Sequence, residues 1–483
     1  MNVIFINLPL LSLKDDYLGS GIPSLPVGTP YLAAYLRANG HKVKIIDAFG
    51  EKPNQTICYK DKYIVRGLIL HEIIEGIPKD VELIGISVHS GEAYSLSLEL
   101  ISMLKIYFSV PLVIGGAFPT INYQDYITAG ANFVVLGEGE HTLLEIIEFI
   151  MGKKGVKDID GIAYPGGVNP KTKFIEDLDS LPFPAIDLLP LENYWGLGYA
   201  HGPVSGKYTF LITSRGCPFN CNFCAAPSIW QRKWRCRSPK NVVDEIEFHY
   251  RKYGIGDFHI QDDNMTINAL RVIEICKEIL KRNLHITWKL AAGMKVETVD
   301  EETLMWMRKA GCIYISISPE TGSKTVLRLM NKPFDFEYAR KMVQMANKIG
   351  IKVQACFVLG FPGETKEDLN MTRDYMKVLT KDGLDEIGIF IMTPLPGASS
   401  YNDFPHQNYE DLNFSPVWRP DYPFLEHLRV KLYVEFLFVK LIYHPQKMIK
   451  SLFNILTRKF ELKMEMTFYR ILRWKFFERK CNL

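Results

Sequence analysis

The 483-residue chain has no run of about 18 uncharged apolar residues, the length that a membrane-spanning helix requires. Its most apolar stretch, residues 424–443, is interrupted by Glu426, Arg429, Lys431, Glu435 and Lys440. Residues 1–13 are apolar, but neither a basic leader nor a small-residue cleavage site accompanies them. We therefore expect a buried strand at the N-terminus, no spanning helix and a cytoplasmic protein.

A strong charge of one sign is also missing, because 57 Lys and Arg face 54 Asp and Glu, for a net charge of +3. This balance does not by itself favour nucleic-acid binding, and we expect no nucleic-acid partner. The hydrophobic fraction of 47% is typical of a globular protein, and the length predicts two or three domains.

Cysteine is scarce in the first 180 residues, where only Cys58 occurs. Three of the nine cysteines, Cys217, Cys221 and Cys224, are close together in the middle of the chain. The others are scattered, and isolated cysteines are usually small core hydrophobes. The group of three is therefore the candidate for metal chemistry.

The first 150 residues alternate short β-branched runs with helical stretches. Strands are predicted at residues 3–7, 42–47, 83–88, 112–116 and 133–137. Helical patterns lie between them, as at residues 31–39, 92–107 and 141–151. Continuous apolar runs suit a parallel sheet that is buried on both faces. The alternation predicts an α/β fold with a doubly wound, Rossmann-like sheet.

A second series of strands and helices begins near residue 207. Strands are predicted at residues 208–213, 257–261, 287–291, 314–318, 353–359 and 386–392. Helices are predicted at residues 239–253, 269–282, 301–309, 336–349 and 367–380. Six such units predict a partial (βα)6 TIM-like barrel.

Two changes of pattern divide the chain. Residues 160–175 predict a hairpin, and residues 181–185, with two prolines, predict a stiff extended linker. After residue 401 the alternation ends, and the chain becomes helical, aromatic and basic. We predict four regions, at residues 1–155, 156–190 (hairpin and proline linker), 191–400 (barrel) and 401–483 (helical C-terminal extension).

The cysteine segment, Arg-Gly-Cys-Pro-Phe-Asn-Cys-Asn-Phe-Cys at residues 215–224, follows a predicted strand and spaces its thiols as C-x3-C-x2-C. Three thiolates can bind three irons of a [4Fe-4S] cube and leave the fourth iron open to an amino-acid ligand. A structural zinc site is the alternative. It needs a fourth ligand at short range, and neither Cys236 nor His249 makes a standard spacing.

With this motif, residues 208–397 resemble the radical S-adenosylmethionine (SAM) superfamily. The resemblance implies that Cys217, Cys221 and Cys224 hold a [4Fe-4S] cluster that cleaves SAM reductively to a 5′-deoxyadenosyl radical. It also implies an electron donor such as flavodoxin or ferredoxin. The cofactor supplies the difficult chemistry in such enzymes, and the barrel orients it and excludes water.

The same resemblance implies SAM contacts in the cysteine loop and after three later strands. They are Phe223, Gln261, Asp262, Asp263, Ser318, Glu320, Gly360, Gly363 and Glu364. The segment after the second strand departs from the Gly-Gly-Glu form of the family and is similar to its cobalamin-dependent branch. Each contact alone has a plainer explanation as a helix cap or a turn.

About 140 N-terminal residues resemble the cobalamin-binding domain that precedes some radical SAM barrels. The implied cobalamin contacts are Leu8, Pro9, Gly28, Thr29, Ser87, Gly115, Gly116, Gly137 and Glu138. The Asp-x-His-x-x-Gly signature of a cobalt-binding histidine is missing, so the resemblance implies base-off cobalamin without a protein imidazole. A domain that has lost cobalamin and serves as a rigid platform is the alternative.

Together the resemblances imply a cobalamin-dependent radical SAM enzyme that methylates an unactivated carbon of a small-molecule or lipid substrate. Cyclisation or rearrangement with the same cofactors, as in the anaerobic porphyrin cyclase relatives, is an alternative. A non-catalytic iron-sulfur and cobalamin-binding module is another. A methylthiotransferase acting on RNA would need three more N-terminal cysteines.

The end of the chain suggests a further partner. Its basic residues are Arg470, Arg473, Lys475, Arg479 and Lys480. Cations and aromatics on one amphipathic helix permit peripheral contact with a membrane. Lysines extended over an ordinary capping helix would give the same pattern.

Overall fold

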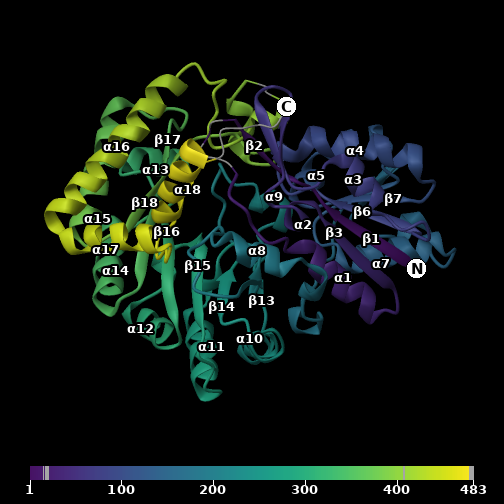
Figure 1. Ribbon diagram of the computed structural model, residues 1–483, viewed down its shortest axis with the longest axis horizontal. Helices are drawn as coiled ribbons and strands as arrows, with labels where there is room; N and C mark the ends of the chain where they lie inside the picture. The colour runs from purple at the N-terminus through teal and green to yellow at the C-terminus, as the bar shows by residue number, and fades with distance from the viewer. Residues whose placement is uncertain (15, 17–20, 406–407, 478–483) are drawn as a thin grey trace.

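The computed structural model describes every residue except 15, 17–20, 406–407 and 478–483. Two large sheets lie beside each other, one in the N-terminal domain and one in the central barrel, and helices cover both (Figure 1). The predicted α/β class, with a doubly wound domain followed by a partial barrel, is confirmed. The four predicted region boundaries remain predictions.

The N-terminal sheet has seven strands in the order β10-β9-β8-β7-β6-β1-β3. They are β1 (Asn2–Asn7), β3 (Lys42–Asp47), β6 (Leu83–Ser87), β7 (Leu112–Gly115), β8 (Phe133–Val135), β9 (Ile162–Tyr164) and β10 (Gly167–Asn169). Strands β1, β3, β6, β7 and β8 are parallel. The order reverses between β1 and β6, and ligands of such sheets bind beyond the carboxyl ends of the strands at this reversal.

Helices cover both faces of this sheet because its central strands are apolar on both sides. Val3 and Phe5 of β1 belong to one core cluster, whereas Ile4 and Ile6 belong to the other. The helices are α1 (Gly28–Ala38), α2 (Ala48–Glu51), α3 (Leu70–Glu75), α4 (Tyr94–Tyr107), α5 (Ala117–Ile121), α6 (Tyr123–Thr128) and α7 (Glu140–Ile150). The continuous apolar runs therefore correctly predicted a sheet that is buried on both faces.

Two features of the N-terminal domain differ from the prediction. The hairpin β9–β10, expected in the linker, pairs antiparallel with β8 and extends the sheet, which covers an otherwise open edge. An unpredicted antiparallel sheet joins β2 (Leu10–Leu13), β5 (Tyr63–Arg66) and β4 (Thr56–Tyr59). Its turn places Lys60 and Asp61 at φ of 46° and 56°, without the Asn-Gly pair that usually marks such a turn.

The barrel sheet consists of six parallel strands in sequence order, as predicted. They are β11 (Tyr208–Leu211), β14 (Asp257–Ile260), β15 (Thr287–Met294), β16 (Cys312–Glu320), β17 (Lys352–Leu359) and β18 (Glu386–Ile391). The helices between them are α10 (Pro239–Tyr253), α11 (Ala269–Lys281), α12 (Glu301–Lys309), α13 (Lys324–Leu329), α14 (Phe336–Ile349) and α15 (Lys366–Lys381). Strands β11 and β18 are the two edges, so the barrel is partial.

The C-terminal extension is helical, with α16 (Tyr422–Tyr443), α17 (Pro445–Thr457) and α18 (Lys463–Phe477). Helix α16 packs on α15 and β18, at the outer edge of the barrel away from the N-terminal domain (Figure 1). Helix α18 returns across the barrel, and Nζ of Lys463 donates to the carbonyl of Ala291 at 2.8 Å. Within the described residues, no helix has the length and apolarity to cross a membrane.

Candidate active site at the cysteine loop

The three cysteines lie on one loop between the short strand β12 (Ser214–Arg215) and helix α9 (Ala226–Trp230), just beyond β11. Their thiols are free and partly exposed. Burial raises the pKa of all three, and that of Cys224 to about 11, so iron binding must displace their protons. Three free thiols on one irregular loop are the donor set of a [4Fe-4S] cluster with an open iron, and they fit it.

In the described part of the chain, no three His, Cys, Asp or Glu side chains are grouped to hold a single metal ion. The candidate fourth ligands of a zinc site have other surroundings. Cys236 ends the short strand β13 (Arg235–Cys236), where it is the antiparallel strand partner of Ser214. His249 is fully buried on α10, beside Glu245.

Two predicted SAM contacts brace the cysteine loop. The buried carboxylate of Asp262 accepts hydrogen bonds from the amide and hydroxyl of Thr213, at 2.7 and 2.6 Å, and from Ser214 Oγ at 2.6 Å. Asp263 accepts from the amide of Gly216 at 3.0 Å. The backbone amide of Gln261 donates a hydrogen bond to the carbonyl of Leu211, at the end of the neighbouring strand. These carboxylates fix where the loop starts.

The far side of the loop is held by the segment after α13. The amide of Asn222 donates to the carbonyl of Met330 at 3.1 Å, and Asn331 Nδ2 donates to the carbonyl of Asn220 at 2.7 Å. The cysteine loop is therefore tied to the barrel both at its start and around Cys221. The ring of Phe223 packs with the apolar cluster around Phe361.

Glu320 stands at the end of β16 in an unusual backbone conformation, with φ of 64°. Left-handed backbone at a non-glycine residue is costly and gathers at functional sites. Lys332 forms an ion pair with Glu320, donates to the carbonyl of Ser318 at 2.7 Å, and lies 5.8 Å from the ring centroid of Phe223. Lys332 joins three predicted SAM contacts, and no sequence motif had marked it.

The glycine-rich turn after β17 is also braced. Oε2 of Glu364 accepts from the amide of Gly360 at 2.6 Å, and burial raises the pKa of Glu364 to about 7. Arg419, from the C-terminal extension, donates to the carbonyl of Gly360 at 2.9 Å. Gly360 and Gly363 both have positive φ, of 79° and 86°. The extension thus supports a turn that was predicted to lie beside SAM.

The end of the N-terminal sheet has room for a ligand against its backbone. A Cβ added at Gly28 would meet nothing within 4 Å, and at Gly115 and Gly137 it would meet only ordinary contacts. At the strand reversal, Thr29 Oγ1 donates to Asn7 Oδ1 at 3.0 Å, which leaves Asn7 Nδ2 buried without a partner. An orphaned donor in such an open edge fits a bound polar cofactor.

Four other predicted cobalamin contacts differ in character. Gly116 has φ of 119°, and a Cβ there would collide with the carbonyl of Val88, so its glycine is required by the backbone itself. Leu8 and Ser87 are partly buried beyond β1 and at the end of β6, and Pro9 is buried. Asn7 was not among the predicted contacts, although a polar residue that ends a buried strand is a usable signal.

Glu138 joins the two domains. Its carboxylate binds Arg215 at 2.9 Å and Arg235 at 2.7 Å, both from the strands that flank the cysteine loop. It also accepts from the amide of Ile175 at 2.9 Å. Glu140 adds a second partner for Arg215 at 2.6 Å. The segment expected to contact cobalamin therefore also holds the cysteine loop in place through ion pairs.

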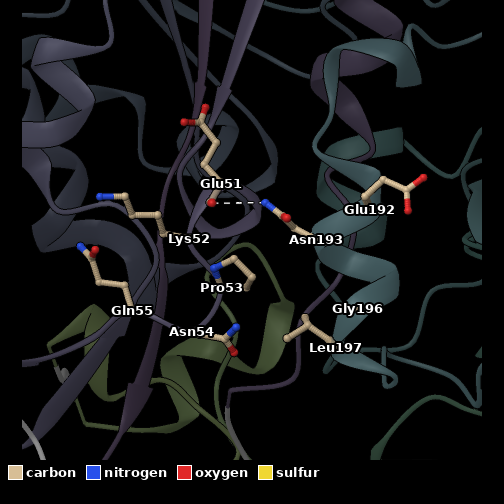
Figure 2. A pocket seen from close by; sticks show the side chains of 9 residues that line it. All are labelled: Glu51, Lys52, Pro53, Asn54, Gln55, Glu192, Asn193, Gly196 and Leu197. Atoms are coloured by element: carbon tan, nitrogen blue, oxygen red, sulfur yellow. Dashed lines mark hydrogen bonds between the residues drawn. The ribbon is translucent and has the colours of Figure 1, made fainter.

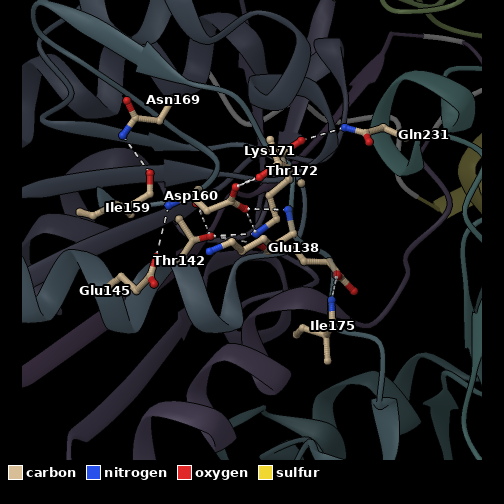
Figure 3. A network of polar contacts seen from close by, with 12 residues as sticks. Glu138, Thr142, Glu145, Ile159, Asp160, Asn169, Lys171, Thr172, Ile175 and Gln231 are labelled. Atoms are coloured by element: carbon tan, nitrogen blue, oxygen red, sulfur yellow. Dashed lines mark hydrogen bonds and ion pairs between the residues drawn. The ribbon is translucent and has the colours of Figure 1, made fainter. Parts of the chain in front are cut away.

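A polar network beside Glu138 extends this contact (Figure 3). Lys171 donates to Thr142 at 3.0 Å and pairs with Asp160 at 3.3 Å. Gln231, at the end of α9, donates to the carbonyl of Lys171 at 2.8 Å. The hairpin after β8 thus connects α7 to the helix that follows the cysteines.

A separate cavity of about 480 Å³ lies between the turn after α2 and helix α8 (Leu191–Leu197) (Figure 2). Its walls are mostly polar, and Asn193 donates to the carbonyl of Glu51 at 3.2 Å. The lining residues are Glu51, Lys52, Pro53, Asn54, Gln55, Glu192, Asn193, Gly196 and Leu197. None of the predicted cofactor contacts is among them.

Comparison with known families agrees with this geometry. The Radical SAM superfamily model matches residues 211–376, and the B12 binding domain model matches residues 21–147. An uncharacterized methyltransferase of Pyrococcus horikoshii is 30% identical over 407 residues, which cover 82% of each chain. The chain belongs to the radical SAM superfamily. Its enzymatic class, and SAM, a [4Fe-4S] cluster and cobalamin as cofactors, are as predicted.

Other relatives of this radical SAM enzyme carry more specific names. Cytidylyl-2-hydroxyethylphosphonate methyltransferase of Streptomyces wedmorensis is 28% identical, with 80% of this chain and 79% of the relative covered. Among solved structures, the radical SAM methyltransferase TsrM of Kitasatospora setae has a TM-score of 0.66 at 18% identity. The match covers 83% of this chain and 75% of TsrM. That structural likeness confirms the fold.

Proposed function

We propose that this enzyme transfers a methyl group to an unactivated carbon of a small-molecule or lipid substrate. Two relatives that share most of their length with this chain are named methyltransferases, and the more distant hopanoid protein of Methylococcus capsulatus is named a C-3 methylase. A donor such as flavodoxin or ferredoxin is proposed to supply the electron.

One observation carries the proposal. The loop after β8 of the N-terminal sheet binds the cysteine loop of the barrel through Glu138 and Arg215, and α5, after β7, contacts α9. The ligand-binding edges of both domains therefore meet at one place. An enzyme that uses two cofactors on one substrate needs this arrangement, because both must reach the same carbon.

The residues can be given distinct tasks. Cys217, Cys221 and Cys224 would hold the [4Fe-4S] cluster, while Gly28, Gly115 and Gly137 would let cobalamin approach the backbone. When bound, these groups supply reductive cleavage of SAM and methyl transfer. Glu320 and Glu364 would accept hydrogen bonds from SAM.

Burial of the surrounding turns serves to exclude water from the reacting groups. Phe223 and Phe361 pack together over one side of the loop, and Arg419 holds the glycine turn closed from the C-terminal extension. These contacts would shield the reacting groups from solvent.

Cyclisation is the second candidate. Anaerobic magnesium-protoporphyrin IX monomethyl ester cyclase of Rubrivivax gelatinosus is 28% identical over 438 residues, and covers 87% of this chain. Both reactions would use the same cofactors, so the residues of the cysteine loop do not separate them.

The test is anaerobic reconstitution with iron, sulfide and cobalamin, followed by incubation with reductant, methyl-deuterated SAM and an extract of candidate substrates. Methyl transfer predicts a product heavier by a deuterated methyl group, with 5′-deoxyadenosine and S-adenosylhomocysteine formed together. Cyclisation predicts 5′-deoxyadenosine without label in the product. Absence of 5′-deoxyadenosine from a protein with a full cluster would indicate a non-catalytic module.

A further inference from the structure

Helix α16 buries two charged side chains, Arg429 and Lys440, among apolar ones, and leaves a further row of apolar side chains on its outer face. Arg429 and Lys440 are only 2% and 3% exposed. On the outer face, Val434, Phe438 and Ile442, spaced four residues apart, are 61%, 63% and 57% exposed. A helix on the surface of a soluble domain usually turns a polar face outward, so the exposed apolar row is the unusual feature.

The buried charges of α16 have specific partners that hold the helix in its orientation. Arg429 forms an ion pair with Glu426 and donates to the carbonyl of Phe414 at 3.2 Å. Lys440 donates to the carbonyl of Asp385. Rotating α16 to hide its outer apolar face would break these contacts, each costly to lose inside a protein.

Helix α17 continues the apolar surface. Ile449, Phe453 and Leu456 follow the i, i+4, i+7 spacing of one helix face and are 71%, 61% and 74% exposed. The two helices contact each other at the turn after Tyr443 and lie together at the outer edge of the molecule (Figure 1). We call their outward faces the α16–α17 surface.

The charges around this surface are mainly positive. Both acidic side chains of α16 form ion pairs within the protein. Glu426 pairs with Arg429, and Glu435 pairs with Arg373 at 2.5 Å. Lys431 is exposed on α16, and Lys381 lies 5.2 Å from the ring centroid of Tyr443. An apolar face with cations beside it is complementary to an anionic lipid surface.

We propose that the α16–α17 surface docks on a membrane that contains anionic lipid, with α16 and α17 lying in the interface. A second copy of the chain fits less well, because a two-fold contact would bring the same cations against each other. The basic tail was the sequence-based candidate for this contact. Its residues 478–483 lie outside the described residues, and the surface found here precedes it.

Flotation of the full, anaerobically reconstituted chain with vesicles tests the proposal. Vesicles of phosphatidylcholine with phosphatidylglycerol should bind the protein, and pure phosphatidylcholine should bind it much less. Leu441, 52% exposed, lies beside Ile442 on α16. The double substitution Phe438→Glu and Leu441→Glu should weaken partitioning at least about tenfold. Ile106→Glu, on α4 at 79% exposed, is the matched control and should leave binding unchanged.

Two results would overturn the proposal. One is wild-type protein that does not float with the anionic vesicles at low salt. The other is a wild-type dimer in sedimentation velocity that the double variant converts to a monomer, which would identify a subunit interface. Milder substitutions, Phe438→Ser and Leu441→Ser, repeat the test if the double variant fails to fold. Vesicle binding and SAM cleavage are measured separately, so either can fail without the other.

Discussion

Nη1 of Arg215 lies 2.9 Å from Oε1 of Glu138, and this ion pair joins the N-terminal domain to the residue two positions before Cys217. Both side chains are largely buried, at 11% and 1% exposed. The position of the cluster loop therefore depends on the other cofactor domain.

Glu138→Gln should lower the free energy of unfolding by roughly 3–5 kcal/mol, because it leaves two buried arginines short of a charge partner. SAM cleavage should fall with it, since the loop loses a fixed contact. Denaturant unfolding and 5′-deoxyadenosine yield measure the two effects.

The matched control for that prediction is Asp187→Asn. Arg37 and Asp187 form a pair of similar length, 2.8 Å, but their side chains are 38% and 41% exposed. Exposed pairs contribute about 1 kcal/mol or less. An equal loss of stability in both variants would show that the buried ion pairs of Glu138 contribute no more than the exposed pair.

Gly216→Ala should reduce the iron content of the purified protein to less than about half. Gly216 has φ of 86°, and a Cβ would collide with the carbonyl of Lys233, so the loop must move. Iron analysis against Gly196→Ala, where a Cβ meets nothing within 4 Å, is the comparison. Full iron occupancy in Gly216→Ala would mean that the loop geometry is not needed for the cluster.

Asp47 predicts a pH dependence of stability. Burial raises its pKa to about 7, although Tyr194 donates to it at 2.8 Å. Because the unfolded carboxyl ionises near pH 4 and the folded one near 7, stability should fall as pH rises between these values. Between pH 4 and 7.5, the free energy of unfolding of Asp47→Asn should rise relative to that of the wild type by on the order of 2–4 kcal/mol.

The opposite sign is expected for Asp300, which caps α12 and accepts from the hydroxyl and the amide of Thr303, at 2.7 and 2.8 Å. These hydrogen bonds lower its pKa, so its contribution is present at neutral pH and lost as pH falls below about 4. Urea midpoints of Asp47→Asn and Asp300→Asn across this range separate the two cases. Parallel pH profiles would contradict the assignment for Asp47.

Much of the fold was predictable, because strand burial leaves a continuous apolar run in the sequence. All six barrel strands and the five parallel strands of the first sheet follow such runs. The sheet of β2, β4 and β5 escaped prediction, since no residue of β4 is fully buried and its turn to β5 uses Lys60 and Asp61. Short strands with an atypical turn carry little local signal.

The candidate site was predictable where chemistry demands particular residue types. The three cysteines could be chosen from nine by spacing alone. Lys332 and Arg419 could not, because they reach Glu320 and Gly360 from distant segments, and no local pattern announces a tertiary contact. The bracing role of Asp262 is hidden for the same reason.

The most direct test of the central claim is the iron and 5′-deoxyadenosine content of Cys221→Ala beside Cys236→Ala, both purified and reconstituted without oxygen. The account predicts that Cys221→Ala loses the cluster absorbance and all SAM cleavage, while Cys236→Ala keeps both. Retained iron and cleavage in Cys221→Ala, or zinc in the wild type that both substitutions remove, would contradict it.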